Sequence, residues 1–214
     1  GAGKTTFVAQ IAGMLSPDSG EIIFSGQEIS TFTAPQRSHL GLARSFQITS
    51  VFPNFTALEN VALSIQAHAG HSFRFWTPAS TDPTLINPAQ KILDQIGLGE
   101  RARTLAGNLA HGQQRQLEIA MALAAGPKML LLDEPTAGMG TEESENMRQF
   151  LGNLKGEYSM LLIEHDMDTV FSLADRVTVL VYGRAIATGT PEQIRNNAEV
   201  RAAYLGEDEV AASA

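Results

Sequence analysis

The stretch from Lys128 to Glu134 constrains the fold of this chain more than any other segment. Residues 129–132 form an unbroken apolar run, Met-Leu-Leu-Leu, which ends in the acids Asp133 and Glu134. A strand that is apolar at successive positions is typical of a parallel sheet covered on both faces. A carboxylate at the end of such a strand is costly to bury unless a positive group faces it. The run therefore predicts a covered parallel sheet with a positive group near its acidic end.

Short apolar stretches alternate with helical patterns along the rest of the chain, which indicates an α/β fold. Residues 69–90 lack either pattern and are expected to form a loop or surface insertion. Strands are expected over residues 21–24, 42–47, 128–133, 158–163, 177–181 and 185–187. Helices are expected over residues 6–15, 56–63, 88–96, 113–125, 142–154, 166–173 and 191–205.

Composition excludes several classes of function. The net charge is −8, the sequence pI is about 5.1 and no block of Lys and Arg occurs, which argues against nucleic-acid binding. The chain has no cysteine, which excludes disulfide frameworks, zinc ribbons and thiol catalysis. No apolar run approaches the roughly 18 residues that span a bilayer, and no signal peptide is visible.

The opening segment GAGKTT matches the end of the phosphate-binding pattern G-x-x-x-x-G-K-[ST]. Glycine backbone N–H groups can surround phosphates, Lys4 can reach the β and γ oxygens, and the Thr5 hydroxyl can ligate Mg²⁺. The alternative is a chance glycine-rich turn before a helix. Because the chain starts within the motif, we expect a truncated copy that lacks the first strand. The expected phosphate-binding residues are Gly1, Ala2, Gly3, Lys4, Thr5 and Thr6.

The acidic end of the 128–133 strand supplies the second half of this expected site. A magnesium-bound nucleotide would provide the positive charge that Asp133 needs, and Glu134 would then polarise the attacking water. The alternative is a pair of strand-end carboxylates that simply face solvent.

A third motif opens the helix that begins near Gln113. Its apolar positions form one face, and in isolation a structural cap would explain the sequence. Its place about twenty residues before an acid-ended strand makes it informative. The motif comprises Leu109, Ala110, His111, Gly112 and Gln113.

Taken in order, the segments GAGKTT, ARSFQ, LAHGQQRQLEIA, MLLLDEP and LLIEHD resemble an ABC-type ATP-binding subunit over nearly the whole chain. The segments AGMG, IEHDMD and AYLGE are most similar to subunits that serve branched-chain amino acid, urea and amide importers. This resemblance implies a P-loop NTPase with a RecA-like parallel sheet, a small antiparallel β region near residues 20–47, and a helical subdomain over roughly residues 56–125. The chain would then be a single ATP-binding domain, residues 1–214.

The resemblance also implies roles for individual residues. Gln47 matches the glutamine that contacts Mg²⁺ and the attacking water and that senses the membrane subunit. His165 matches the switch histidine that contacts the γ-phosphate and helps to hold Glu134 and the water. The segment Leu109–Gln113 matches the signature motif, which clamps ATP bound to the opposite protomer, and residues 137–140 take the D-loop position. The implied metal ligands are Thr5, Gln47 and Asp133.

This sequence departs from the family pattern in three places. The upstream strand and the aromatic residue that would stack on adenine are absent. Ala110 lacks the usual serine hydroxyl and His111 replaces a glycine, so the signature should bind the partner's phosphate less strongly. Finally, the D-loop segment AGMG lacks its usual acidic residue.

The implied activity is ATP hydrolysis with Mg²⁺, coupled to an importer of branched-chain amino acids or small amides. The implied partners are a second ATP-binding subunit, identical or different, transmembrane permease subunits and, indirectly, a periplasmic binding protein. The implied location is the cytoplasmic face of the inner membrane, as a peripheral subunit. Three alternatives stay open: an exporter-type subunit such as one for lipopolysaccharide, a soluble ABC ATPase of DNA repair or translation, and an inactive fragment.

Overall fold

The central sheet is parallel, as the apolar run at 128–133 predicts. The computed structural model describes residues 2–44, 51–68 and 82–203. Strands β3 (Leu42–Arg44), β4 (Met129–Asp133) and β5 (Ser159–Ile163) pair in the order β3-β4-β5. The middle strand is covered on both faces, since the side chains at 130–132 are at most 1% exposed. The sheet therefore brings the ends of β4 and β5 side by side.

The antiparallel region is smaller than the sequence predicts. Strands β1 (Ile23–Phe24) and β2 (Gln27–Glu28) form a hairpin that turns at Ser25 and Gly26, both with positive φ. The prediction that the strand starting at residue 42 belongs to this region is wrong, because β3 pairs in parallel with β4. The rest of that expected strand, residues 45–47, lies outside the described residues. The residues of β3 at 42 and 43 are buried and pack in the apolar core around the sheet, not in a surface hairpin.

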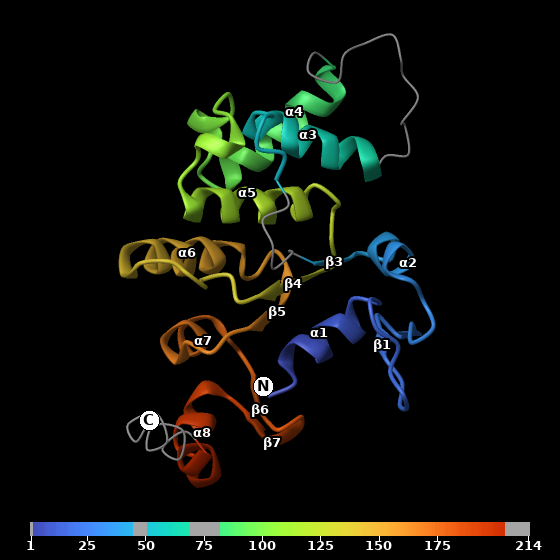
Figure 1. Cartoon of the computed structure of the whole chain (residues 1–214), viewed down its shortest axis with the longest axis vertical. Coiled ribbons are helices and arrows are strands. Elements are labelled where there is room, and N and C mark those ends of the chain that lie inside the picture. The colour runs from blue at the N-terminus through green and yellow to red at the C-terminus, as the bar shows by residue number, and fades with distance from the viewer. Residues whose placement is uncertain (1, 45–50, 69–81, 204–214) are drawn as a thin grey trace.

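Helices lie on both sides of the central sheet (Figure 1). Helix α1 (Lys4–Ile11) contacts β4, while α6 (Thr141–Leu154) contacts α7 (Met167–Leu173). The short helix α2 (Ala34–His39) leads into β3.

A helical layer packs above β3 and α6 in the view of Figure 1. It contains α3 (Ala57–His68), α4 (Pro83–Gln95) and α5 (His111–Leu123), with short 3₁₀ turns at Gly99–Arg101 and Ala106–Asn108. As expected, Thr56 caps α3, because its hydroxyl accepts a hydrogen bond from the N–H of Glu59 at 3.2 Å.

Helix α4 starts earlier than predicted, inside the stretch interpreted as a loop. Asp82 accepts a hydrogen bond from the Thr84 N–H at 2.9 Å, and Pro83 occupies the first helical position, where its missing N–H costs nothing. The prediction of a start at Pro88 is therefore wrong, and Pro88 lies inside the helix.

The C-terminal part of the described chain forms an antiparallel pair, β6 (Val177–Val181) and β7 (Arg184–Gly189), followed by α8 (Pro191–Arg195). A single helix over 191–205 is not observed. The carboxamide of Asn197 accepts from the N–H groups of Glu199 and Val200, so a separate helical stretch begins at 198.

One apolar cluster joins the helical layer to the sheet. It includes Val61 from α3, Leu93 from α4, Leu117 from α5, Leu130 from β4 and Leu151 from α6, each fully buried. None of the helices in the described ranges is long and apolar enough to cross a membrane.

Candidate functional site

The N-terminal end of α1 is fixed against two other parts of the chain. Gly3 has φ 86°, a conformation that favours glycine, and a Cβ there would lie 3.3 Å from Cα of Gly183. The N–H of Gly183 donates to the carbonyl of Ala2 at 3.0 Å. Lys4 opens the helix, and its Nζ donates to the carbonyl of Glu164 at 3.3 Å. The predicted phosphate-binding lysine therefore lies at the end of β5.

The structure describes some of the other residues of the predicted phosphate loop and not others. Thr5 and Thr6 are exposed in the first turn of α1, where hydroxyl groups are accessible to a ligand. Gly1 lies outside the described residues, as does Gln47.

Asp133 is buried at the end of β4 and faces a positive group. The residue is 2% exposed, and its Oδ2 lies 3.2 Å from Nη2 of Arg44, which ends β3. Its carbonyl accepts from Nη2 of Arg115 at 2.8 Å. The sequence predicts a positive group near Asp133 but does not identify either arginine, because neither is close to Asp133 in the chain.

Glu134 and His165 come together across the ends of β4 and β5. The distance between His165 Nδ1 and Glu134 Oε1 is 3.5 Å, and the side chains are 66% and 30% exposed respectively. Glu134 has φ 46°, and its N–H donates to the carbonyl of Ile163 at 2.9 Å. A non-glycine residue with positive φ costs energy and is commonly retained at functional sites. The strained turn therefore lies where the carboxylate meets the imidazole.

Glu164 positions both loops of this site, although the sequence analysis gave it no role. Its carboxylate is fully buried and accepts from the N–H of Thr136 at 3.1 Å, the Thr136 hydroxyl at 2.5 Å and the N–H of His165 at 3.2 Å. The loop after β4 is thereby tied to the loop after β5. The available signal was an acid directly before His165 at the end of a buried strand.

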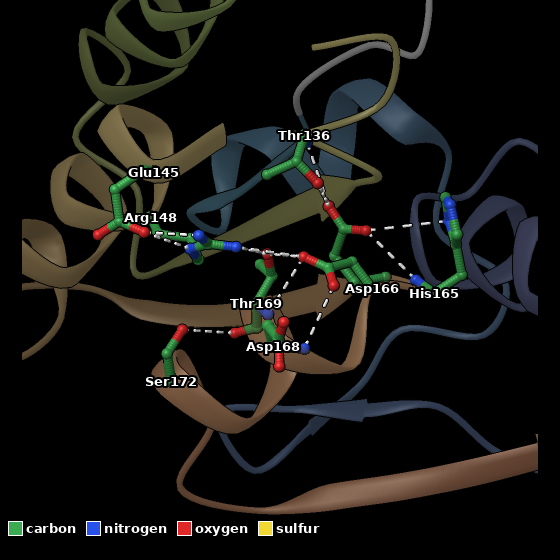
Figure 2. A network of polar contacts seen from close by, with 9 residues as sticks. Thr136, Glu145, Arg148, His165, Asp166, Asp168, Thr169 and Ser172 are labelled. Carbon is green, nitrogen blue, oxygen red and sulfur yellow. Dashed lines mark hydrogen bonds and ion pairs between the residues drawn. The ribbon is translucent and has the colours of Figure 1, made fainter. Parts of the chain in front are cut away.

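A second polar cluster holds the segment that follows His165 (Figure 2). The Asp166 carboxylate caps α7 and accepts from the hydroxyl of Thr169, which holds the pKa of Asp166 below its ordinary value. Arg148 contacts Asp166 at 3.4 Å and also pairs with Glu145, lowering the pKa of the Glu145 carboxyl. Helix α6 therefore anchors the start of α7.

The signature segment Leu109–Gln113 forms the start of α5. Ala110 is the N-cap, and its N–H donates to Oε1 of Gln113 at 3.2 Å. The Gln114 amide donates to the carbonyl of Leu109 at 3.1 Å, which fixes the entry to the helix. His111 and Ala110 are exposed. The Gln113 side chain thus accepts the N–H of the N-cap residue Ala110, while the helix start stays accessible.

The signature segment lies beside the D-loop turn, and its start is well separated from the start of α1 (Figure 1). A Cβ at Gly138 would lie 4.0 Å from Cε1 of His111, and one at Gly112 would lie 3.6 Å from Oε1 of Glu143. Within one chain, then, the structure brings Lys4, Asp133, Glu134 and His165 to the ends of β4 and β5. The segment Leu109–Gln113 occupies a second place, next to residues 137–140.

Known proteins share this arrangement. The ABC transporter family profile matches residues 1–137, and a profile for branched-chain amino acid ATP-binding cassette transporters matches residues 186–210. The crystal structure of the ADP conformation of MJ1267, an ATP-binding cassette of an ABC transporter, superimposes with a TM-score of 0.82 at 28% identity. That match covers 96% of this chain and 84% of the other.

The fold and the paired sites define an ABC-type ATPase domain, and the chain belongs to the ATP-binding family of ABC transporters. It is 39% identical to the high-affinity branched-chain amino acid transport ATP-binding protein BraF of Pseudomonas aeruginosa, over 97% of this chain and 84% of that protein. LivG of Escherichia coli K12 matches to the same extent. The lipopolysaccharide export protein LptB of Haemophilus influenzae is 30% identical over 97% of this chain and 83% of LptB. Members of this family are ATPases that power transport.

Proposed function

We propose that this protein is the ATP-hydrolysing subunit of an ABC importer for branched-chain amino acids or related small amides. The observation that carries the chemistry is the contact between Glu134 and His165 at the ends of two parallel strands. The solute class rests on the relatives, since BraF and LivG are named for branched-chain amino acid transport. The lower identity to LptB favours this class over the exporter alternative.

The residues at the strand ends suit a magnesium nucleotide. Asp133 offers a buried carboxylate and Thr5 an exposed hydroxyl, and Mg²⁺ prefers hard oxygen ligands of this kind. We propose Thr5, Asp133 and Gln47 as the residues that hold the metal. When bound, Mg²⁺ neutralises charge on the phosphates.

The chain's own groups account for the other requirements of hydrolysis. The N–H groups at the start of α1 and the ammonium of Lys4 bind phosphate oxygens. Glu134 accepts a hydrogen bond from water and orients it for attack on the γ-phosphate. His165 supports that carboxylate through Nδ1, and the exposed remainder of its ring is free to contact the γ-phosphate. Gln47 is proposed as a further contact to the water.

A second ATP-binding subunit completes the site under this proposal. The start of α5 is exposed and lies away from the start of α1 of its own chain. The first N–H groups of a helix have no partner within the helix and favour anions. These groups would bind the γ-phosphate of nucleotide held by the partner. Because Ala110 brings no hydroxyl, we propose that the partner is a related but different chain with a stronger signature. Recovery of an active transporter with only this ATPase chain would contradict that part.

Residues 56–125 are proposed to act as a helical subdomain that receives the permease. A cavity of about 400 Å³ lies between α2, β3, α3 and α5, and its lining includes Ala67, Met121 and Ala125. An apolar hollow between two layers suits a short helix from a membrane subunit. The protein would then be peripheral, at the cytoplasmic face of the inner membrane, and would act with a periplasmic binding protein only indirectly.

Reconstitution tests the proposal. The protein is combined with its permease and second ATPase subunit in vesicles, with ATP and the binding protein supplied on opposite sides. ATP-dependent accumulation of radiolabelled leucine is expected, and the Glu134→Gln variant serves as the control without hydrolysis. Nucleotide binding and hydrolysis without uptake of any branched-chain amino acid or small amide would overturn the solute class and leave the ATPase assignment intact.

A further inference from the structure

Arg44 makes an incomplete set of contacts at the acidic end of β4. Its Nη2 lies 3.2 Å from Oδ2 of Asp133, while its Nη1 contacts only a thioether, Sδ of Met14, at 2.8 Å. Its Nε is buried and has no hydrogen-bond partner among the described residues. A thioether is a weak acceptor, and a buried donor without an acceptor costs free energy. Among the residues that the structure describes, only one of the three guanidinium nitrogens therefore has a strong acceptor.

A structural arginine in the same chain looks different. Every guanidinium nitrogen of Arg37 donates to a backbone carbonyl: Nε to Phe32, Nη1 to Gln10 and Ile11, and Nη2 to Ser30, at 2.6–3.0 Å. Arg37 is 1% exposed, whereas the Arg44 side chain is 13% exposed. Arg37 is therefore fixed by its surroundings, and Arg44 is held mainly by one carboxylate.

Arg44 also has room to move. It lines the cavity of about 400 Å³ between the sheet and the helical layer, and the carboxylate-bearing residue Glu118 lines the same cavity. A guanidinium that leaves Asp133 can turn into this space without first displacing a packed side chain. Arg44 therefore belongs both to the lining of this cavity and to the site at the end of β4.

Charge makes the contact with Asp133 conditional. A carboxylate that is 2% exposed needs a positive neighbour, and Arg44 supplies it in this structure. A divalent cation on the same carboxylate would stand within a few ångströms of the guanidinium. At such distances in a partly buried site, like charges repel by several kcal/mol, roughly 4 kcal/mol per pair of unit charges. This repulsion weakens the contact between Arg44 and Asp133 once a divalent cation binds the carboxylate.

We propose that Arg44 is the resident counter-ion of Asp133 and yields this carboxylate when Mg²⁺ enters with nucleotide. The inference rests on the proposed magnesium site. Arg44 is a positioning residue here: it orients the Asp133 carboxylate between turnovers, and it competes with the metal. Metal occupancy at the end of β4 then decides whether the Arg44 side chain lies on Asp133 or in the cavity beside the helical layer.

The test measures the Mg²⁺ requirement of nucleotide binding, not activity. A fluorescent ADP analogue is titrated in EDTA and over a range of free Mg²⁺ with the parent chain, Arg44→Met and Arg44→Lys. The matched control is Arg103→Met, which removes the same charge from an exposed position. Melting temperatures are recorded in EDTA and in saturating Mg²⁺ with ADP.

Arg44→Met removes the competitor of the metal. Mg²⁺ should therefore stimulate its binding of the ADP analogue half-maximally at a concentration about tenfold lower than in the parent chain, which is the factor for one lost contact to a charged group. Its melting temperature should fall in EDTA and recover with Mg²⁺ and ADP, because the metal replaces the missing charge. Arg44→Lys keeps the charge but offers only a single contacting nitrogen. Its Mg²⁺ requirement should therefore lie between those of the parent and Arg44→Met. Arg103→Met should match the parent.

An unchanged or higher Mg²⁺ requirement in Arg44→Met would overturn the proposal that Arg44 and Mg²⁺ exchange on Asp133. An equal fall in melting temperature with and without the metal would also overturn it. Either result would make Arg44 a fixed structural residue. If Arg44→Met does not fold, Arg44→Lys decides, and a requirement no lower than that of the parent overturns the proposal. Failure of the parent chain to bind the ADP analogue in either condition would instead contradict the proposed function.

Discussion

The imidazole Nδ1 of His165 lies 3.5 Å from Oε1 of Glu134, although the two residues follow different strands. The parallel pairing of β4 with β5, in which Asp133 is opposite Ile163, places the two loops next to each other. The positive φ of Glu134 then turns its side chain toward the neighbouring loop. The contact therefore depends on strand register and on one strained residue, and both features can be tested.

Replacing Glu134 by Gln separates hydrolysis from binding. The variant keeps the size and hydrogen bonding of the side chain but loses the base, so phosphate release should fall by a factor on the order of 10² or more. Nucleotide affinity should stay near that of the parent, because Lys4, Thr5 and Asp133 are intact. Phosphate release and nucleotide titration are measured in parallel. Hydrolysis near the parental rate would mean that Glu134 is only a strand-end carboxylate.

The buried carboxylate of Glu164 should contribute strongly to stability. Glu164→Gln turns one acceptor oxygen into an amide that faces the donors of Thr136 and His165, so a loss of about 1–3 kcal/mol in the free energy of unfolding is expected. Urea unfolding provides the measurement. Glu28→Gln, which alters an exposed acid on β2, serves as the control and should change stability little. A loss no greater than that of the control would show that the two loops do not depend on Glu164.

Acid stability should depend on the hydrogen bond from Thr169 to Asp166. The pKa of Asp166 is lowered from its ordinary 3.8, first by the Thr169 hydroxyl. The unfolded chain therefore binds the proton at higher pH than the folded chain, and the stabilisation is complete above the ordinary pKa and is lost as pH falls through the folded one. Thr169→Val removes that hydroxyl at similar volume. The free energy of unfolding of this variant should be lower than that of the parent at pH 6, and the difference should shrink below pH 3. Urea unfolding across this pH range provides the measurement. A difference that does not depend on pH would contradict the role given to the Thr169 hydroxyl.

A hydroxyl at the N-cap of α5 should be beneficial. Ala110 occupies the cap without an acceptor side chain, so Ala110→Ser is expected to stabilise the chain by about 0.5–2 kcal/mol. In the Glu134→Gln background it should also increase the fraction of closed dimer with ATP, measured by size-exclusion chromatography. Ala110→Gly, which relaxes the backbone but adds no oxygen, is the comparison. An equal gain in dimer with glycine would exclude a role for the hydroxyl.

The sequence predicted the central strand and the chemistry at its end because both are local. Successive leucines indicate a covered strand, and an acid that follows them lies at its carboxyl edge. The approach of Glu134 to His165 was predicted through family resemblance, and the structure supplies the distance.

The arginine beside Asp133 could not be predicted in the same way. Arg44 reaches Asp133 only because β3 pairs with β4 in parallel, a non-local register that no periodicity in the chain expresses. The expected grouping of 42–47 with the hairpin failed for the same reason. The start of α4 was missed because Asp82 and Pro83 were read as loop residues, although an acid followed by proline also begins helices.

The three hydrogen bonds accepted by Glu164 join the backbone at His165 to the backbone and hydroxyl at Thr136. The turn that follows Thr136 passes beside His111 at the start of α5. A shift of the histidine backbone must therefore move Glu164, and with it the neighbouring turn, or break the bond from the His165 N–H to a fully buried carboxylate. The two loops are thus held together through a single buried carboxylate. Under the proposed function, loss of the γ-phosphate at His165 would be transmitted through this carboxylate to the turn beside the start of α5.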